Sequence, residues 1–101
     1  MERAAKNTVG ISLMASAETE AAIDYLRESA PAVTISARDC FTKIECTGLL
    51  EFDMAAIAER LGRPLDTDMF LVNMSSYYGR IVVEPGWVRI YSEIQPERFR
   101  E

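Results

Sequence analysis

The sequence predicts an α+β domain, in which two helices pack on a mixed, largely antiparallel sheet system. Several short segments have alternating apolar residues, and two have apolar residues every three or four positions. Each half of the chain runs strand, helix, strand, strand. A length of 101 residues suits one domain. We expect it to span residues 8–94, with a mobile segment at 1–7 and a tail at 95–101.

The first half begins with a strand over residues 9–14, in which every second residue is apolar. Ser16 is a typical helix N-cap, and the apolar stripe that follows it predicts an amphipathic helix. Pro31 is expected to end this helix, because proline lacks the N–H that a helix needs. Alternation then predicts two further strands, over residues 33–37 and 41–46.

The second half follows the same plan more loosely. A strand over residues 49–52 leads to Asp53, which is expected to cap a short helix with apolar residues at helical spacing. Gly62 is expected to end that helix in the left-handed conformation. Residues 79–84 and 87–91 alternate on both sides of a Pro-Gly pair, which predicts a β-hairpin.

Composition excludes several classes of partner. The net charge is −5, and the basic residues form no cluster, so nucleic acids and anionic membranes are poor partners. No apolar run approaches the ~20 residues that a membrane-spanning helix needs. The N-terminus has no apolar segment typical of a secretory signal. We therefore expect a cytoplasmic protein that binds neither nucleic acid nor membrane.

The chain offers no set of catalytic, cofactor-binding or metal-ligating residues. It has no histidine, the most common general base near neutral pH. Cys40 and Cys46 are too few for a zinc site, and we expect two unreactive, reduced thiols. Asp66 begins a segment similar to a calcium loop, but Leu71 and Tyr77 occupy the positions of its glycine and glutamate. Asp66 or the next residue is expected to cap a turn instead.

A polar and aromatic segment over residues 73–80 separates the second helix from the hairpin. Asparagine and serine favour turns, so a purely structural loop is one interpretation. Tyrosine, methionine and arginine are enriched at the centres of protein interfaces, so a binding surface is the other. Composition alone leaves both interpretations open.

Four segments together resemble one protein family, and they occur in its order and spacing: residues 7–11, 61–64, 73–79 and 88–91. The sequence resembles the effector proteins, also called coupling or regulatory proteins, of soluble bacterial diiron monooxygenases. These small components accompany methane, phenol, toluene, alkene and propane hydroxylases. With few residues before its first strand, the chain is similar to the short-tailed members of the family.

The resemblance implies a non-catalytic protein without metal or cofactor. It implies binding to the diiron hydroxylase near its metal site, and an indirect relation to the reductase or ferredoxin. Its action would be to shift the hydroxylase conformation, so that oxygen activation and NADH use are coupled to hydrocarbon oxidation. Residues 77–80 depart from the Phe-Ala-Gly-Gln expected of toluene and phenol members, which favours an alkene or propane system.

The resemblance also places hydroxylase-binding residues at the start of the first strand and in the polar and aromatic segment. They are Asn7, Thr8, Gly10, Asn73, Met74, Ser75, Ser76, Tyr77, Tyr78, Gly79 and Arg80. One of the two tyrosines is expected to anchor the complex. An alternative is a ferredoxin-like regulatory domain that binds a small molecule, although residues 13–16 make a poor ligand loop.

Overall fold

The computed structural model describes residues 8–30 and 32–92, and it confirms the α+β class. The predictions for residues 1–7, for Pro31 and for the tail at 95–101 lie outside this range. In chain order, the elements are β1 (Thr8–Met14), α1 (Ala17–Ser29), β2 (Thr34–Ala37), β3 (Phe41–Thr47), β4 (Leu49–Asp53), α2 (Met54–Leu61), α3 (Thr67–Leu71), β5 (Met74–Tyr78), β6 (Arg80–Glu84) and β7 (Trp87–Tyr91).

The strands form two sheets rather than one. Sheet A has the order β2-β3-β1-β5, and sheet B has the order β4-β7-β6. Every pair of neighbouring strands in them is antiparallel, so the parallel component of the predicted mixed system is absent from the described residues. Short turns reverse the chain between β2 and β3 and between β6 and β7, which imposes this direction.

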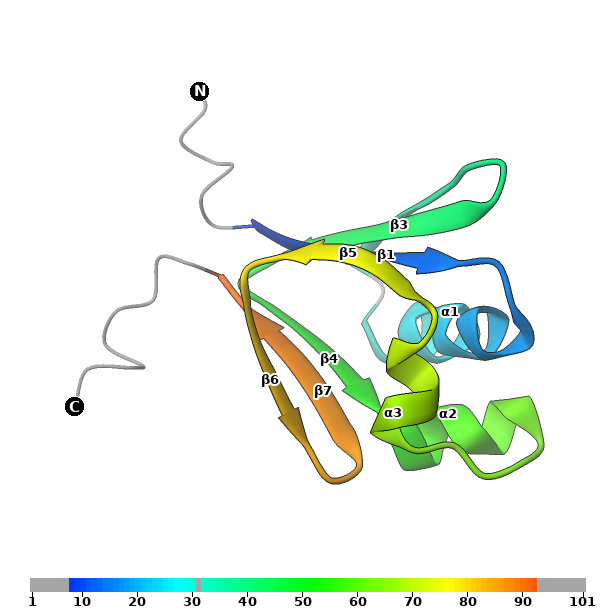
Figure 1. Cartoon of the computed structure of the whole chain (residues 1–101). Coiled ribbons are helices and arrows are strands. Elements are labelled where there is room, and N and C mark those ends of the chain that lie inside the picture. Colours follow the sequence, from blue (N-terminus) through cyan, green and yellow to red (C-terminus); the bar gives the residue numbers. More distant parts are fainter. Residues whose placement is uncertain (1–7, 31, 93–101) are drawn as a thin grey trace.

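One strand of the second half joins the sheet of the first half. β5 belongs to the second half, yet it pairs with β1 at the edge of sheet A. From there the chain passes directly into β6, at the edge of sheet B (Figure 1). The edges of the two sheets are thus consecutive in sequence, and Gly79 is the single residue between them.

Helix α1 covers one face of sheet A, which we call the inner face. Ser16 is the predicted N-cap, and its hydroxyl accepts a hydrogen bond from the Thr19 amide at 3.1 Å. The apolar stripe of α1 packs with the alternating apolar residues of β1 and β3 in one core. The fully buried members of this core include Val9, Leu13, Ala22, Leu26, Ile44, Phe52, Ile57 and Ile90.

Helix α2 begins and ends where the sequence predicts. The Asp53 carboxylate accepts hydrogen bonds from two amides of its first turn, and Gly62 follows it at φ 85°. The predicted hairpin also forms, with Ile81 paired to Ile90 and Val83 to Val88. No helix within the described residues has both the length and the apolarity needed to cross a membrane.

Helix α3 is an addition to the two predicted helices. Asp66 caps it, and its Oδ1 accepts a hydrogen bond from the Met69 amide at 2.9 Å. Phe70 is fully buried, and the centroid of its ring lies 4.8 Å from the centroid of the Phe52 ring. Five residues are too few to show a helical period, and the helix is fixed by this tertiary contact. Asp66 therefore caps a turn, as predicted, and that turn is the first turn of α3.

Candidate functional site

The polar and aromatic segment is a strand for most of its length, not a loop. Residues Met74–Tyr78 form β5 and pair with β1 along the edge of sheet A. Serine and asparagine favour turns, but pairing with β1 and the strand preference of tyrosine prevail here. Because no strand among residues 8–30 and 32–92 pairs with the other side of β5, part of its backbone N–H and C=O groups are open to a partner.

The register of β5 decides which side chains share a face. Tyr78 pairs with Gly10 and Ser76 with Ser12, so these four lie on the outer face of sheet A, opposite α1. The register then shifts, and Ser75 lies at the irregularity, where its hydroxyl donates to the Ser12 carbonyl at 3.3 Å. The two predicted serines therefore differ: the Ser76 side chain lies on the outer face of sheet A, whereas the Ser75 hydroxyl is bound to the backbone of β1.

Tyr78 is held in place by its own chain. Its ring lies over Gly10, where a Cβ atom would come within 2.5 Å of the ring. Its hydroxyl donates to Glu45 Oε2 at 2.5 Å. Burial raises the pKa of Tyr78, and the hydrogen bond to Glu45 adds to this effect. Gly10 therefore leaves room for the Tyr78 ring, which any larger residue at this position would meet.

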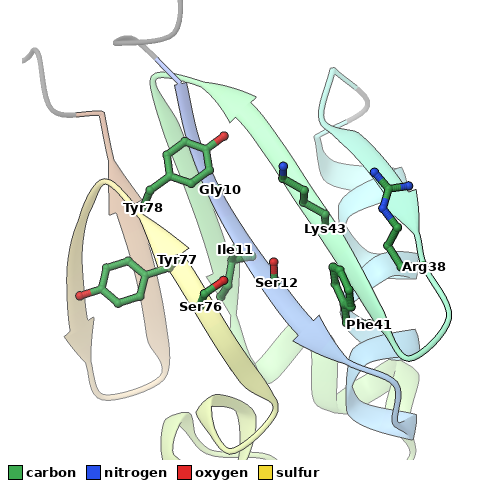
Figure 2. A pocket seen from close by; sticks show the side chains of 9 residues that line it. All are labelled: Gly10, Ile11, Ser12, Arg38, Phe41, Lys43, Ser76, Tyr77 and Tyr78. Atoms are coloured by element: carbon green, nitrogen blue, oxygen red, sulfur yellow. The ribbon is translucent and has the colours of Figure 1, made fainter.

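Tyr77 has the opposite orientation (Figure 2). It pairs with Ile11 and points away from β1, with 44% of its surface exposed. Within the described residues, its hydroxyl has no hydrogen-bond partner. An exposed ring with an unengaged hydroxyl can bury area against a partner at little cost. The structure thus separates the two tyrosines, which composition could not do.

Asn73 has a structural role that the sequence interpretation missed. Its side-chain amide donates to the carbonyls of Met69 and Phe70, both at 3.4 Å, at the end of α3. Its own carbonyl accepts from the Met14 amide at 2.7 Å. Asn73 therefore joins α3 to the end of β1, and these contacts engage the NH₂ group of its side chain.

Gly79 also serves the fold. Its φ is 116°, and a Cβ atom here would lie 2.7 Å from Ile90 and 2.8 Å from the Tyr91 carbonyl oxygen. A side chain has no room at this passage between the sheets. Of the other predicted residues, Thr8 begins β1 and Arg80 begins β6, while Asn7 lies outside the described residues.

The outer face of sheet A contains a hollow of about 330 Å³ (Figure 2). We call this feature the sheet A hollow. It is lined by Gly10, Ile11, Ser12, Arg38, Phe41, Lys43, Ser76, Tyr77 and Tyr78. Four of these are predicted site residues, and the structure brings them together with Arg38, Phe41 and Lys43 from the β2–β3 hairpin. Strand alternation could have placed Phe41 and Lys43 on this face, but the pairing of β3 with β1 was needed to bring them to β5.

Exposed apolar residues gather beside the same strand. Among the described residues, six large hydrophobic side chains are exposed, and only Val83 lies away from β5, α3 and the adjoining end of β1. The other five are Met14, Met69, Val72, Tyr77 and Tyr78. We call this set the β5 surface. Exposed large apolar side chains on neighbouring elements are a common feature of protein interfaces.

No catalytic or metal-binding arrangement occurs in the part of the chain that the structure describes. No three histidine, cysteine or acidic side chains there are grouped to hold a metal ion. The two cysteines are unpaired: Cys40 is exposed, and the Cys46 thiol donates to the Leu49 carbonyl at 3.1 Å. Burial raises the pKa of Cys46, which disfavours its reactive thiolate.

Comparisons with known proteins agree with this arrangement. The profile of the MmoB/DmpM family matches residues 7–91. A chain from a phenol hydroxylase–regulatory protein complex has a TM-score of 0.74 at 18% identity, covering 83% of this chain and 97% of that one. Soluble methane monooxygenase regulatory protein B has a TM-score of 0.68 at 27% identity, covering 94% of this chain and 73% of its own. No curated protein sequence matches significantly. The chain belongs to the MmoB/DmpM family of monooxygenase regulatory proteins.

Proposed function

We propose that this protein is the cofactorless coupling component of a multicomponent diiron monooxygenase. It binds the hydroxylase near the diiron site through the β5 surface and favours one hydroxylase conformation. Electrons reach the hydroxylase from a reductase or ferredoxin, which this chain affects only indirectly. Family membership favours this function over a ferredoxin-like domain that binds a small molecule.

The observation that supports the proposal is the set of exposed apolar side chains on β5, on or next to α3 and at the adjoining end of β1, within the residues that the family profile matches. Tyr77 and Tyr78 are 44% and 38% exposed, on a strand whose outer edge is unpaired within the described part of the chain. Tyrosine and methionine are enriched at the cores of protein interfaces, and tyrosine is among the residue types that most often dominate binding energy. Gly10, Asn73 and Gly79 support this surface by positioning Tyr78, joining α3 to β1 and allowing the passage into sheet B.

The mechanism requires differential binding. A regulatory protein shifts its partner only by as much as it binds one conformation better than the other. A difference of about 1–3 kcal/mol changes the balance about 5- to 150-fold. If the favoured conformation is the one that activates oxygen with hydrocarbon bound, fewer electrons are lost to peroxide. We place this action in the cytoplasm, and the departure at residues 77–80 favours an alkene or propane system.

The test is the yield of product for each NADH consumed, measured with the cognate hydroxylase and reductase while this protein is titrated. The native protein should raise the yield to a plateau. Tyr77→Ala should need a concentration about 30-fold higher, because truncation of an interface anchor typically costs about 2 kcal/mol. Val83→Ala is the matched control, since Val83 is 47% exposed but lies on β6, away from the β5 surface.

The outcomes separate the general function from the role of the anchor. A yield that does not respond to the native protein would contradict the coupling function. A response in which Tyr77→Ala and Val83→Ala behave alike would keep the function and remove Tyr77 as its anchor. Thermal melting of both variants should stay near that of the native protein, because neither side chain belongs to the hydrophobic core.

A further inference from the structure

The sheet A hollow exists because small residues occupy the middle of a face whose margins carry large ones. Along one row across the strands, Lys43 pairs with Ser12 and Ser12 with Ser76. In the next row, Gly10 has no side chain and the Tyr78 ring lies over it. On the other side, Phe41 pairs with Met14 at the end of β1. The hydroxyl groups of Ser12 and Ser76 therefore form the floor of the hollow, between the rings of Phe41 and Tyr78.

The cations of this hollow stand out in an acidic chain. The protein has a net charge of −5, yet none of the residues lining the hollow is acidic, and two of them are Arg38 and Lys43. Lys43 Nζ lies 3.6 Å from Glu45, beside the hollow, which offsets part of its charge. Arg38 has no ion pair among residues 8–30 and 32–92. Figure 2 shows both cations extending to the same side of the sheet.

We infer that the sheet A hollow receives the carboxylate of an aspartate or glutamate side chain of the hydroxylase. This inference rests on the function proposed above and adds a second, electrostatic contact to the apolar β5 surface. The two surfaces are continuous, because Tyr77 and Tyr78 belong to both.

The chemistry of the lining fits this group. The guanidinium of Arg38 can donate two parallel hydrogen bonds to a carboxylate, and Lys43 supplies a second positive charge. The hydroxyls of Ser12 and Ser76 lie on the floor and can donate as well. The hollow is on the outer face of a sheet, where a side chain that projects from a partner can enter as the surfaces meet. Small-molecule sites are more often enclosed.

The first test reverses one charge. Arg38→Glu should weaken binding of the cognate hydroxylase about tenfold or more at about 0.05 M salt, and the deficit should shrink at about 0.5 M salt. Arg38→Lys should recover part of the affinity, because it keeps the charge but loses the paired donors. The control is Arg27→Glu, which makes the same charge change at an exposed position of α1, on the opposite side of sheet A.

The second test uses the native protein and therefore does not depend on a variant that folds. A carbodiimide joins a lysine amine directly to a carboxylate that touches it. The chain has two lysines, Lys6 and Lys43, so the products are few. Lys43 can also form an amide with Glu45 of its own chain, 3.6 Å away, so the free protein is treated in parallel. Mass spectrometry of the cross-linked complex should find, beside that internal product, Lys43 joined to an acidic residue of the hydroxylase.

The results distinguish this inference from the proposed function. If the native protein does not bind the hydroxylase, both are overturned. If it binds, but Arg38→Glu weakens the complex no more than Arg27→Glu does, the carboxylate site is wrong and the coupling function stands. Binding of the native protein with no hydroxylase adduct on Lys43 also counts against the site. Melting curves for each variant confirm that a loss of affinity does not come from unfolding.

Discussion

Gly79 provides the sharpest test of how the fold is built, because it is the single residue between β5 of sheet A and β6 of sheet B. In Gly79→Ala the new Cβ would meet Ile90 at 2.7 Å and the Tyr91 carbonyl oxygen at 2.8 Å. The backbone φ of 116° adds strain. Such strain costs about 1–3 kcal/mol, and overpacking costs about 1–3 kcal/mol more. We therefore expect Gly79→Ala to lower the free energy of unfolding by about 2–6 kcal/mol.

Gly86→Ala is the matched comparison. Gly86 also has a positive φ, of 83°, but a Cβ atom there would meet nothing within 4 Å, so only the backbone strain applies. Thermal unfolding followed by circular dichroism measures both variants. For a domain of this size, each kcal/mol corresponds to about 4–8 °C, so Gly79→Ala should lower Tm by at least about 8 °C. If Gly79→Ala melts no lower than Gly86→Ala but loses hydroxylase binding, the structural role is refuted.

Three other measurements test the core, the thiols and Tyr78. Ile57→Ala should lower the free energy of unfolding, measured in urea, by about 2–5 kcal/mol, because it leaves a cavity in the core. Glu59→Ala, on the exposed side of α2, should leave that free energy unchanged, and equal effects of the two substitutions would contradict the packing. Iodoacetamide should alkylate Cys40 quickly and Cys46 slowly in the native state, and equal rates would contradict the burial of Cys46. The difference in phenolate absorbance between the native protein and Tyr78→Phe reports the titration of Tyr78, and its midpoint should lie above the ordinary pKa of 10.0. The contribution of Tyr78 to the free energy of unfolding should be complete below pH 10.0 and should decrease as the pH rises through the raised pKa of the folded state.

Much of the fold follows from local pattern. The alternation in β1 and β3, the stripe of α1 and the caps at Ser16 and Asp53 all indicate their elements correctly. These features depend on nearest neighbours in the chain, so the sequence shows them directly. The hairpin of β6 and β7 belongs to the same class, because a two-residue turn brings its strands together.

The parts that depend on distant contacts could not be predicted. β5 contains the residues typical of a loop and becomes a strand only by pairing with β1, more than fifty positions earlier in the chain. α3 is too short for a period and is held by Phe70 against Phe52. The different roles of Tyr77 and Tyr78 follow from the register with Ile11 and Gly10, and from the position of Glu45. Tertiary pairing, and not local propensity, therefore determines the candidate site.

Amide hydrogen exchange of this protein, alone and in complex with the cognate hydroxylase, tests most directly whether β5 contacts the hydroxylase. β5 is an edge strand, so its amides that face away from β1 should exchange rapidly in the free protein. If β5 contacts the hydroxylase, exchange in Met74–Tyr78 should slow on binding, while the solvent-facing side of α1 and all of α2 stay unchanged. Unchanged exchange in β5 at saturating hydroxylase, or protection confined to α1 and α2, would contradict that contact.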